Sequence, residues 1–218
     1  MPTDTHADAP SLSALVRSRT TTDHRSAERS GFPSALVRGE VALEGYVDLL
    51  AQHRYAYEVL EEVRDRHLSD PDVGPFLDAR LLRSQALADD LVDLAGPTWS
   101  VAHPPSAATV AYVEAIAATA VDPVAHLAHH YTRYLGDLSG GQFIGRVAAS
   151  TYGLGDGRAG RFATFAGIDD PAAYRDEYRA RLDALDWPVD RQEALVAAVH
   201  EAYRHNEAVF DDLARHVD

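Results

Sequence analysis

The chain of 218 residues contains no cysteine. Disulfide bonds, thiolate metal sites and a cysteine nucleophile are therefore excluded, and histidine must supply any soft metal ligand. Lysine is also absent, so all 20 basic residues are arginines, and 34 acidic residues bring the formal net charge to −14. Such an acidic chain repels phosphate polyanions, and we expect no nucleic-acid partner. The lack of cysteine is typical of a reducing cytoplasm, which is the location we expect.

Long apolar runs are missing too. The most apolar stretch, Val110 to Val121, carries Glu114 and falls short of the roughly 18 apolar residues that a membrane-spanning helix needs, so we expect no membrane insertion. Residues 1–10 are polar and lack the features of a secretory signal, which predicts a disordered tail. The remaining residues 11–218 are enough for one core, and we expect a single domain and a monomer.

Patterns typical of β-strands are almost absent, whereas apolar residues recur at helical spacing. The segments with this spacing are Leu12–Arg29, Gly39–His67, Pro75–Leu94, Ala107–Thr119, Pro123–Ser150, Ala172–Leu185 and Arg191–His216. Aspartate–proline pairs at 70–71, 122–123 and 170–171 predict helix starts. Loops are predicted at 30–33, 96–106, 153–160 and 187–188. The predicted fold class is all-α, a single-domain helical bundle.

The segment Tyr131–Gln142 places three glycines, Gly136, Gly140 and Gly141, inside a predicted helix, together with Asp137. Each interior glycine costs about 1 kcal/mol relative to alanine, so local stability does not account for them. Gly136 and Gly140 are four residues apart and leave one helix face without side chains. A flat ligand lying against the backbone would use this face. A helix–helix contact of small residues also explains the glycines, but not the adjoining polar residues.

A histidine near the end of the first predicted helix, His24, is followed one turn later by Glu28. A carboxylate can hold the proton on one imidazole nitrogen and leave the other free to bind a metal. Arg17 lies two turns before His24, and Arg175 and Arg179 form another pair four apart. The alternative is a surface His–Glu pair and arginines that only solvate helix faces. Together these residues would suffice for a porphyrin, whose iron needs an axial ligand and whose two propionates need cations.

Three widely separated patterns resemble the haem oxygenase family. They are Thr20, His24, Ala27 and Glu28, which resemble its proximal-ligand helix; Tyr131–Gln142, which resembles its distal-helix signature; and Tyr203–Leu213. The resemblance runs from about Leu12 to Leu213. It implies a haem sandwiched between a proximal helix and a glycine-rich, kinked distal helix.

The resemblance also implies roles for individual residues. His24 would be the axial ligand of the haem iron, with Glu28 as its hydrogen-bonding partner. Asp137, Arg133, Gly136 and Gly140 match the catalytic positions: the glycines would touch the distal face of haem, and Asp137 would organise the distal waters. The positions matched to propionate binding are Arg17, Tyr131, Arg175 and Arg179. Those matched to the polar network behind the distal pocket are Tyr57, Glu61, Arg133 and Asn206, and Phe210 fits an aromatic position of the last helix.

In that family haem b is both substrate and cofactor, and O2 and external electrons convert it to biliverdin, carbon monoxide and ferrous iron. The resemblance implies a ferredoxin or a flavin reductase as redox donor, and leaves iron acquisition or haem turnover open as the purpose. This sequence has arginine at positions 17 and 175, where relatives often have lysine, so the geometry of the hydrogen bonds to a propionate differs from theirs. We still expect cleavage at the α carbon, giving biliverdin IXα, because the tyrosine and all three cations are present.

Two other classes of protein stay open at this point. A non-catalytic haem-binding or storage protein would keep His24 and the arginines, but would not need Asp137. A di-iron or other metal enzyme is suggested by His126, His129 and His130, a cluster we expect on a solvated or packing face. The paired Glu-x-x-His motifs of such enzymes are missing, since Glu201 and His205 are four apart and have no counterpart. The sequence therefore favours the haem-degrading enzyme.

Overall fold

The computed structural model describes residues 10–29, 31–154 and 159–217, apart from the side chain of Glu28. Nine residues of the predicted tail lie outside this part, so that prediction is not addressed. All regular structure in the described part is helical, which confirms the all-α prediction. No helix there is long and apolar enough to cross a bilayer.

The helices are α1 (Leu12–Arg29), α2 (Gly31–Val37), α3 (Leu43–His67), α4 (Ser84–Ala95), α5 (Trp99–Ala102), α6 (Ala107–Ala118), α7 (Pro123–Gly136), α8 (Gln142–Tyr152), α9 (Pro171–Asp183) and α10 (Val189–Leu213). Short 3₁₀ turns are η1 (Gly74–Phe76), η2 (Ala79–Leu81), η3 (Thr119–Val121) and η5 (Ala214–His216). A π-helical turn, η4 (Asp137–Gly141), joins α7 to α8.

Several predicted boundaries are wrong. Residues 31–33, predicted as a loop, begin α2, because Pro33 sits in the first turn, where its missing N–H is tolerated, and Phe32 is fully buried. The predicted helix 75–94 is regular only from residue 84, after η1 and η2. The predicted helix 39–67 starts at residue 43, because Gly39 has a left-handed φ of 73°. The predicted loop 96–106 contains α5.

Aspartate caps begin two of the helices as predicted. The Asp122 carboxylate accepts hydrogen bonds from the backbone N–H groups of Val124 and Ala125 at 3.0 and 3.1 Å, and Asp170 does the same at the start of α9. Asp70, by contrast, caps a turn that leads into η1 rather than an α-helix. An aspartate–proline pair therefore predicts capped backbone, and the following residues decide whether an α-helix forms.

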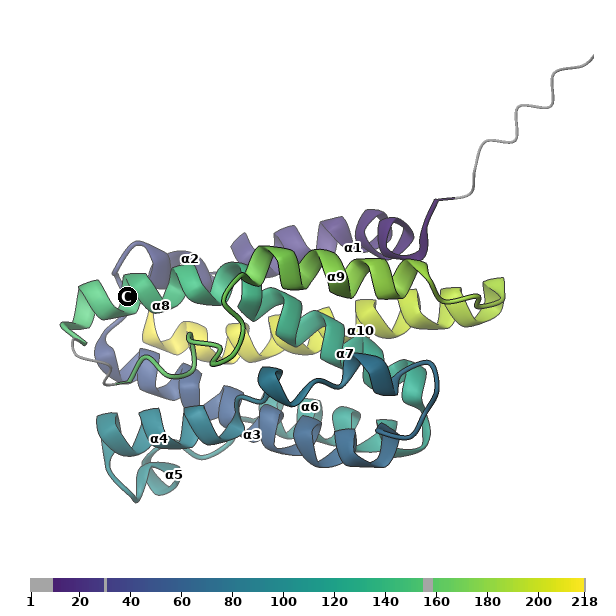
Figure 1. Ribbon diagram of the computed structural model, residues 1–218. Coiled ribbons are helices and arrows are strands. Elements are labelled where there is room, and N and C mark those ends of the chain that lie inside the picture. Colours follow the sequence, from purple (N-terminus) through teal and green to yellow (C-terminus); the bar gives the residue numbers. More distant parts are fainter. Residues whose placement is uncertain (1–9, 30, 155–158, 218) are drawn as a thin grey trace, which may run out of the picture.

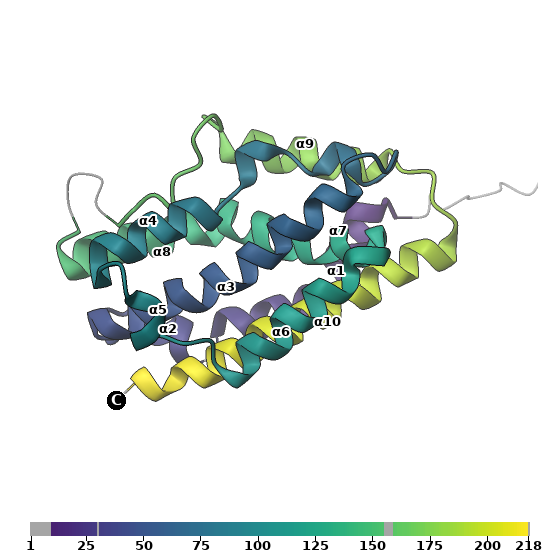
Figure 2. The same ribbon diagram turned by 90° about the horizontal axis from the view of Figure 1, so that it is seen from below.

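The long helices bring distant parts of the chain together. Figures 1 and 2 show α1 and α9 lying along one side of the molecule, with α10 running between α1 and α6. Helix α10 contacts both α1 and α7, while α3 packs against α4, α6 and α7. The core between these helices includes the fully buried rings of Tyr57, Tyr112, Tyr134 and Tyr178. The N-terminal helix and the glycine-rich segment thus share α10 as a common support.

Polar contacts fix α1 on its two neighbours. Ser13 donates from its backbone N–H and its hydroxyl to the Asp183 carboxylate, at 2.7 and 2.9 Å. Asp23, next to His24, lies 2.5 Å from Nδ1 of His200 on α10. Leu12 and Val16 pack into the core on the same helix. These contacts tie the segment that carries His24 to both α9 and α10.

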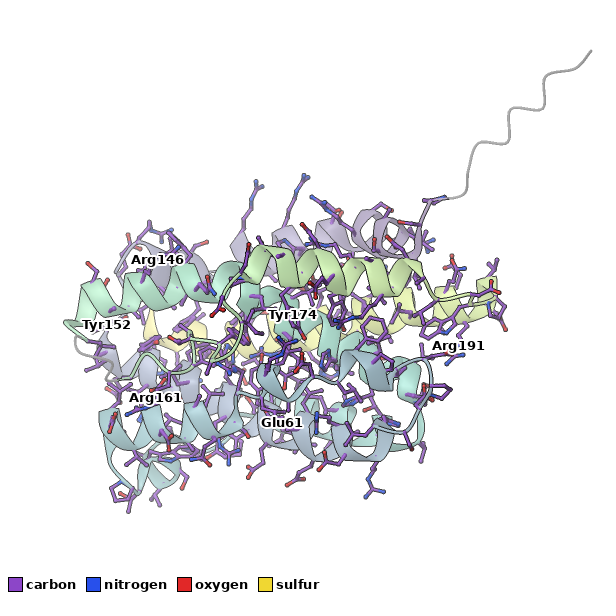
Figure 3. The ribbon with its side chains drawn as sticks, viewed as in Figure 1. Glu61, Arg146, Tyr152, Arg161, Tyr174 and Arg191 are labelled. Carbon is purple, nitrogen blue, oxygen red and sulfur yellow. The ribbon has the colours of Figure 1, made fainter. Side chains whose placement is uncertain are left out.

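A buried arginine and a buried aspartate hold residues 159–170, which precede α9. Arg83 is 5% exposed; it donates to the carbonyl oxygens of Phe162 and Thr164, at 3.3 and 2.5 Å. Asp90 on α4 accepts from the backbone N–H of Phe162 at 2.9 Å and from the guanidinium of Arg161 at 3.1 Å. Figure 3 shows Arg161 beside α4. The segment is therefore anchored, and with it the position of the Phe162 ring.

Candidate functional site

The three glycines of the α7–α8 connection serve different purposes. A Cβ atom added at Gly136 or Gly140 would meet nothing within 4 Å, so this strip of backbone is open. A Cβ at Gly141 would lie 3.3 Å from the Cβ of Asp137, so this glycine makes room for the acid. The Ser139 hydroxyl donates to the carbonyl oxygens of Leu135 and Gly136 within the π turn. A π turn of this kind is frequent at functional sites.

The open strip lines a cavity that we call the inner cavity. His24 lines the same cavity from α1, so the structure brings the predicted proximal and distal elements together. The empty volume inside it is about 970 Å³, a figure that includes space open to solvent at its mouth. Its apolar wall is formed by Leu49, Leu50, Ile144, Phe162 and Phe210.

A second space, the outer cavity, continues from the first. The two share the lining residues His24, Thr132, Gly136, Ser139, Gly140 and Tyr203. The outer cavity adds the four residues predicted to bind propionates, Arg17, Tyr131, Arg175 and Arg179. An apolar inner part, a cationic outer part and a strip free of side chains together fit a flat molecule with two carboxylates, such as a porphyrin.

Four arginines line the outer cavity, and the three of them that were predicted to bind propionates differ in how they are held. Arg175 donates to the carbonyl oxygen of Leu138 in the π turn, which ties α9 to the glycine-rich segment. Arg179 pairs with the exposed Asp176 at 2.8 Å. Arg17 is exposed and makes no ion pair within the described residues. Positive charge therefore gathers at the mouth of the site on an otherwise acidic chain.

His24 is on the exposed side of α1 and faces the shared part of the two cavities. Its ring meets the ring of Tyr203 edge-on, with centroids 6.1 Å apart and an interplanar angle of 76°. Ala27, one turn later, is buried. The side chain of Glu28 lies outside the described residues, so its predicted pairing with His24 stays a prediction.

Four of the predicted polar residues form a connected group behind the glycine strip. The Tyr57 hydroxyl donates to the Asp137 carboxylate, and Arg133 donates to Oδ1 of Asn206 at 2.7 Å. The guanidinium of Arg133 also lies over the Tyr57 ring, 4.7 Å from its centroid. Two nitrogens of Arg133, Nε and Nη2, are buried without a partner among the described residues. Both nitrogens are enclosed by protein atoms, so Arg133 acts on the cavity through its positive charge rather than through these donors.

The Asp137 carboxyl is half-buried and lines the inner cavity. Burial raises the pKa of Asp137 above its usual value, while the positive charge of Arg133 and the hydrogen bond from Tyr57 act in the opposite direction. A carboxyl in this environment can both accept and release a proton near the cavity.

Glu61 has a different position from the rest of the predicted network. Its carboxylate accepts from the backbone N–H groups of Arg83 and Ser84, at 2.5 and 2.9 Å, and so caps the start of α4. It meets the network through Tyr134, whose hydroxyl donates to it at 3.3 Å. The Tyr134 ring lies 5.2 Å from that of Tyr57. Figure 3 shows Glu61 on the side of the bundle away from α1.

The histidines of α7 pack in the core, each with a different neighbour. The His126 ring lies 5.1 Å from that of His67, the His129 ring 5.6 Å from that of Tyr112, and Nδ1 of His130 is 3.0 Å from the Tyr178 hydroxyl. Across the described ranges, no three metal-ligating side chains come together. The cluster therefore forms part of a packing face, and the di-iron interpretation finds no support in it.

These buried histidines predict acid sensitivity. Burial, above all, lowers the pKa of His126 to about 3 and that of His129 to about 4, from an ordinary value of 6.5. Above pH 6.5 neither the folded nor the unfolded state binds a proton at these rings. Below pH 6.5 these rings take up a proton in the unfolded state but not in the folded state, so the free energy of unfolding falls as the pH is lowered. For His126 alone, we expect the free energy of unfolding to fall by about 1.4 kcal/mol per pH unit between about pH 6 and pH 4.

Urea unfolding at a series of pH values measures this effect. His126→Phe keeps a ring of similar size but cannot take up a proton. A plot of the free energy of unfolding against pH should therefore be less steep for the variant than for the parent, by the contribution of about one proton, over the same range. Identical slopes for the two proteins would contradict the assignment of His126 as a buried neutral ring.

Several lining residues were not predicted from the sequence. His53 lies one helical turn before Tyr57, so helical spacing could have placed it on the same face. Tyr203 was noted only as the start of a segment, although it lines the cavity and its ring packs against that of His24. Phe162 comes from an irregular segment without periodicity, so no pattern in the sequence indicates its position.

Comparison with known proteins gives a consistent result. The family model described as Heme oxygenase matches residues 10–212 of the chain. Heme oxygenase 1 from Nostoc sp. is 34% identical over 203 residues, which cover 93% of this chain and 85% of that protein. Heme oxygenase 1 from Rattus norvegicus is 33% identical over 207 residues, covering 93% of this chain and 71% of that protein.

Solved structures show the same similarity. Heme oxygenase-1 from Synechocystis sp. PCC6803, in complex with heme, has a TM-score of 0.87 and 32% identity, over 94% of this chain and 92% of that one. Heme oxygenase from Leptospira interrogans has a TM-score of 0.88 and 31% identity, over 93% of this chain and 100% of that one. The likeness therefore extends over nearly the whole fold.

Proposed function

The chain belongs to the haem oxygenase family and is a haem-degrading enzyme, and on this premise we propose that it cleaves haem b to biliverdin, carbon monoxide and ferrous iron with O2 and external electrons. The observation that carries the proposal is the shared cavity: His24 on one side and the bare strip at Gly136 and Gly140 on the other, with arginines at the mouth. Bound haem supplies both the redox-active iron and the ring that is oxidised.

On the proximal side, a ring nitrogen of His24 would bind the iron. As a neutral imidazole, His24 would donate less electron density to the iron than a thiolate would. On the opposite side, Gly136 and Gly140 would let the haem plane approach the backbone closely. The apolar wall that includes Phe162 and Phe210 would exclude bulk water from the ring.

The polar group behind the strip would handle protons. Asp137 would hold a water by its carboxylate oxygens and pass a proton to the oxygen side of the site. The Tyr57 hydroxyl fixes the carboxylate, and the guanidinium of Arg133 places a positive charge beside it. Waters positioned in this way favour attack on the ring over unproductive oxidation.

The outer cavity would set the orientation of haem. Arg17, Arg175, Arg179 and Tyr131 would bind the two propionates, and this anchoring decides which ring carbon faces the oxygen. We propose the α carbon, giving biliverdin IXα. The same arginines would attract an acidic electron donor, a ferredoxin or a flavin reductase, to the exposed haem edge. We further propose a cytoplasmic monomer.

Reconstitution with hemin tests the function directly. The protein is loaded with one equivalent, supplied with ascorbate or a reductase system in air, and followed by absorption. The Soret band should give way to bilin absorption, and chromatography of the product should show biliverdin IXα. A Soret band that persists through the reaction would instead identify a protein that only stores haem.

A further inference from the structure

His53 is a buried histidine that the roles described above do not use. It lies on α3, is 8% exposed, and lines the inner cavity together with Asp137 and Arg133. Its ring packs between two aromatic rings of the apolar wall, with centroids 5.8 Å from Phe162 and 6.4 Å from Phe210. An imidazole in such a wall needs an explanation, because an apolar side chain would pack there without a polar group to satisfy.

The ring nitrogens of His53 face the cavity. Neither has a hydrogen-bond partner among the described residues. Some unpartnered side-chain atoms are fully enclosed by protein, such as Nε and Nη2 of Arg133, but the two ring nitrogens of His53 are not. Both nitrogens of His53 therefore open onto the cavity space, and only what the cavity contains can satisfy them.

The His53 ring is neutral at ordinary pH. Burial first, and then the positive charge of Arg133, keep the pKa of His53 well below 6.5. A neutral imidazole has one N–H donor and one acceptor nitrogen, so it can join a chain of waters in either direction. The other titratable and charged groups that line the cavity are His24, Tyr46, Arg133, Asp137 and Tyr203.

We propose that His53 hydrogen-bonds a water in the inner cavity and so extends to α3 the water network held by Asp137. A buried water needs two to four polar partners, and His53 and Asp137 supply two of them in the wall of the same cavity. His53 thus acts as a positioning residue, through water. The proposal rests on the proposed function, because it assigns His53 to the oxygen side of bound haem.

The test compares three variants loaded with ferric haem. His53→Leu removes both hydrogen-bonding nitrogens and keeps an apolar side chain, whereas His53→Gln keeps a donor and an acceptor. His126→Leu is the matched control, because it replaces a buried histidine that lines neither cavity. The measured quantity is the pH midpoint of the acid–alkaline transition in the absorption spectrum of the ferric complex, which reports hydrogen bonding on the oxygen side without turnover.

We expect His53→Leu to move this midpoint by about half a pH unit, the size expected for one lost hydrogen bond, and His53→Gln to restore it. His126→Leu should leave it in place. An unmoved midpoint in His53→Leu, an equal shift in His126→Leu, or no recovery in His53→Gln would each overturn the proposal.

If the variants do not fold, the ¹⁵N chemical shifts of the His53 ring in the unsubstituted, haem-loaded protein test whether the ring is hydrogen-bonded. An unprotonated nitrogen that accepts a hydrogen bond resonates upfield of a free one, and a free value would overturn the proposal. Failure of the proposed function shows separately, as the absence of bilin from the unsubstituted protein.

Discussion

Replacement of Asp137 by alanine is expected to slow bilin formation from bound haem at least about 100-fold, the lower range of what a positioned proton-transfer group contributes. Asp137 supplies the only carboxylate among the described residues that line the inner cavity. Its loss leaves the buried Tyr57 hydroxyl without its acceptor and Arg133 without the neighbouring negative charge. Haem should still bind, because His24 and the arginines are untouched. Single-turnover absorption spectra with a fixed reductant measure the rate.

Two further variants separate the carboxylate from its surroundings. Tyr57→Phe removes only the hydrogen bond to the carboxylate, so we expect a loss of about tenfold or less. Asp137→Asn keeps the shape and one acceptor but cannot take up the proton, and should resemble the alanine variant. If Asp137→Ala forms biliverdin at the parent rate and yield, the role assigned to this residue is wrong.

Replacement of His24 by alanine should abolish the histidine-ligated Soret spectrum of the haem complex. His24 is the histidine that α1 contributes to both cavities, opposite the glycine strip. An alanine at this position leaves room for free imidazole, which should bind in the gap and restore the spectrum. Absorption spectra of the hemin-loaded variant, before and after addition of imidazole, measure both effects.

His205→Ala is the matched control for this experiment. His205 is on α10 and stacks on Tyr112, with ring centroids 5.3 Å apart, and it lines neither cavity. Its replacement should leave the Soret band unchanged. A parent-like spectrum from His24→Ala would mean that another histidine binds the iron.

The sequence predicts the fold class correctly, and several residues that it assigns to one site line a common cavity, for identifiable reasons. Glycines inside a helix carry an energetic cost, so Gly136 and Gly140 point to a ligand even before the fold is known. Helical spacing places His24 and Arg17 on one side of α1, and the structure brings both to the outer cavity. Both residues come close to residues 131–142 because α1 and α7 pack on α10, and no local sequence pattern predicts this packing.

Other features could not be predicted because they depend on tertiary contacts. Glu61 meets the predicted network through Tyr134, and the backbone N–H groups at the start of α4, which no local pattern indicates, also hold its carboxylate. The anchoring of Phe162 depends on Arg83 and Asp90, which lie more than 70 residues earlier in the chain. Pro33 was interpreted as a helix breaker, although in the first turn of a helix it is tolerated.

The packing of α1 on α9 and α10 also bears on how the enzyme matures. Translation makes the segment with His24 well before α9 and α10, the two helices that support it. Until α10 has been made and has packed, the wall that carries His24 lacks its support and cannot be held opposite the glycine strip. A tetrapyrrole that meets the chain before then finds no complete cavity, so the uptake of haem depends on the packing of α10.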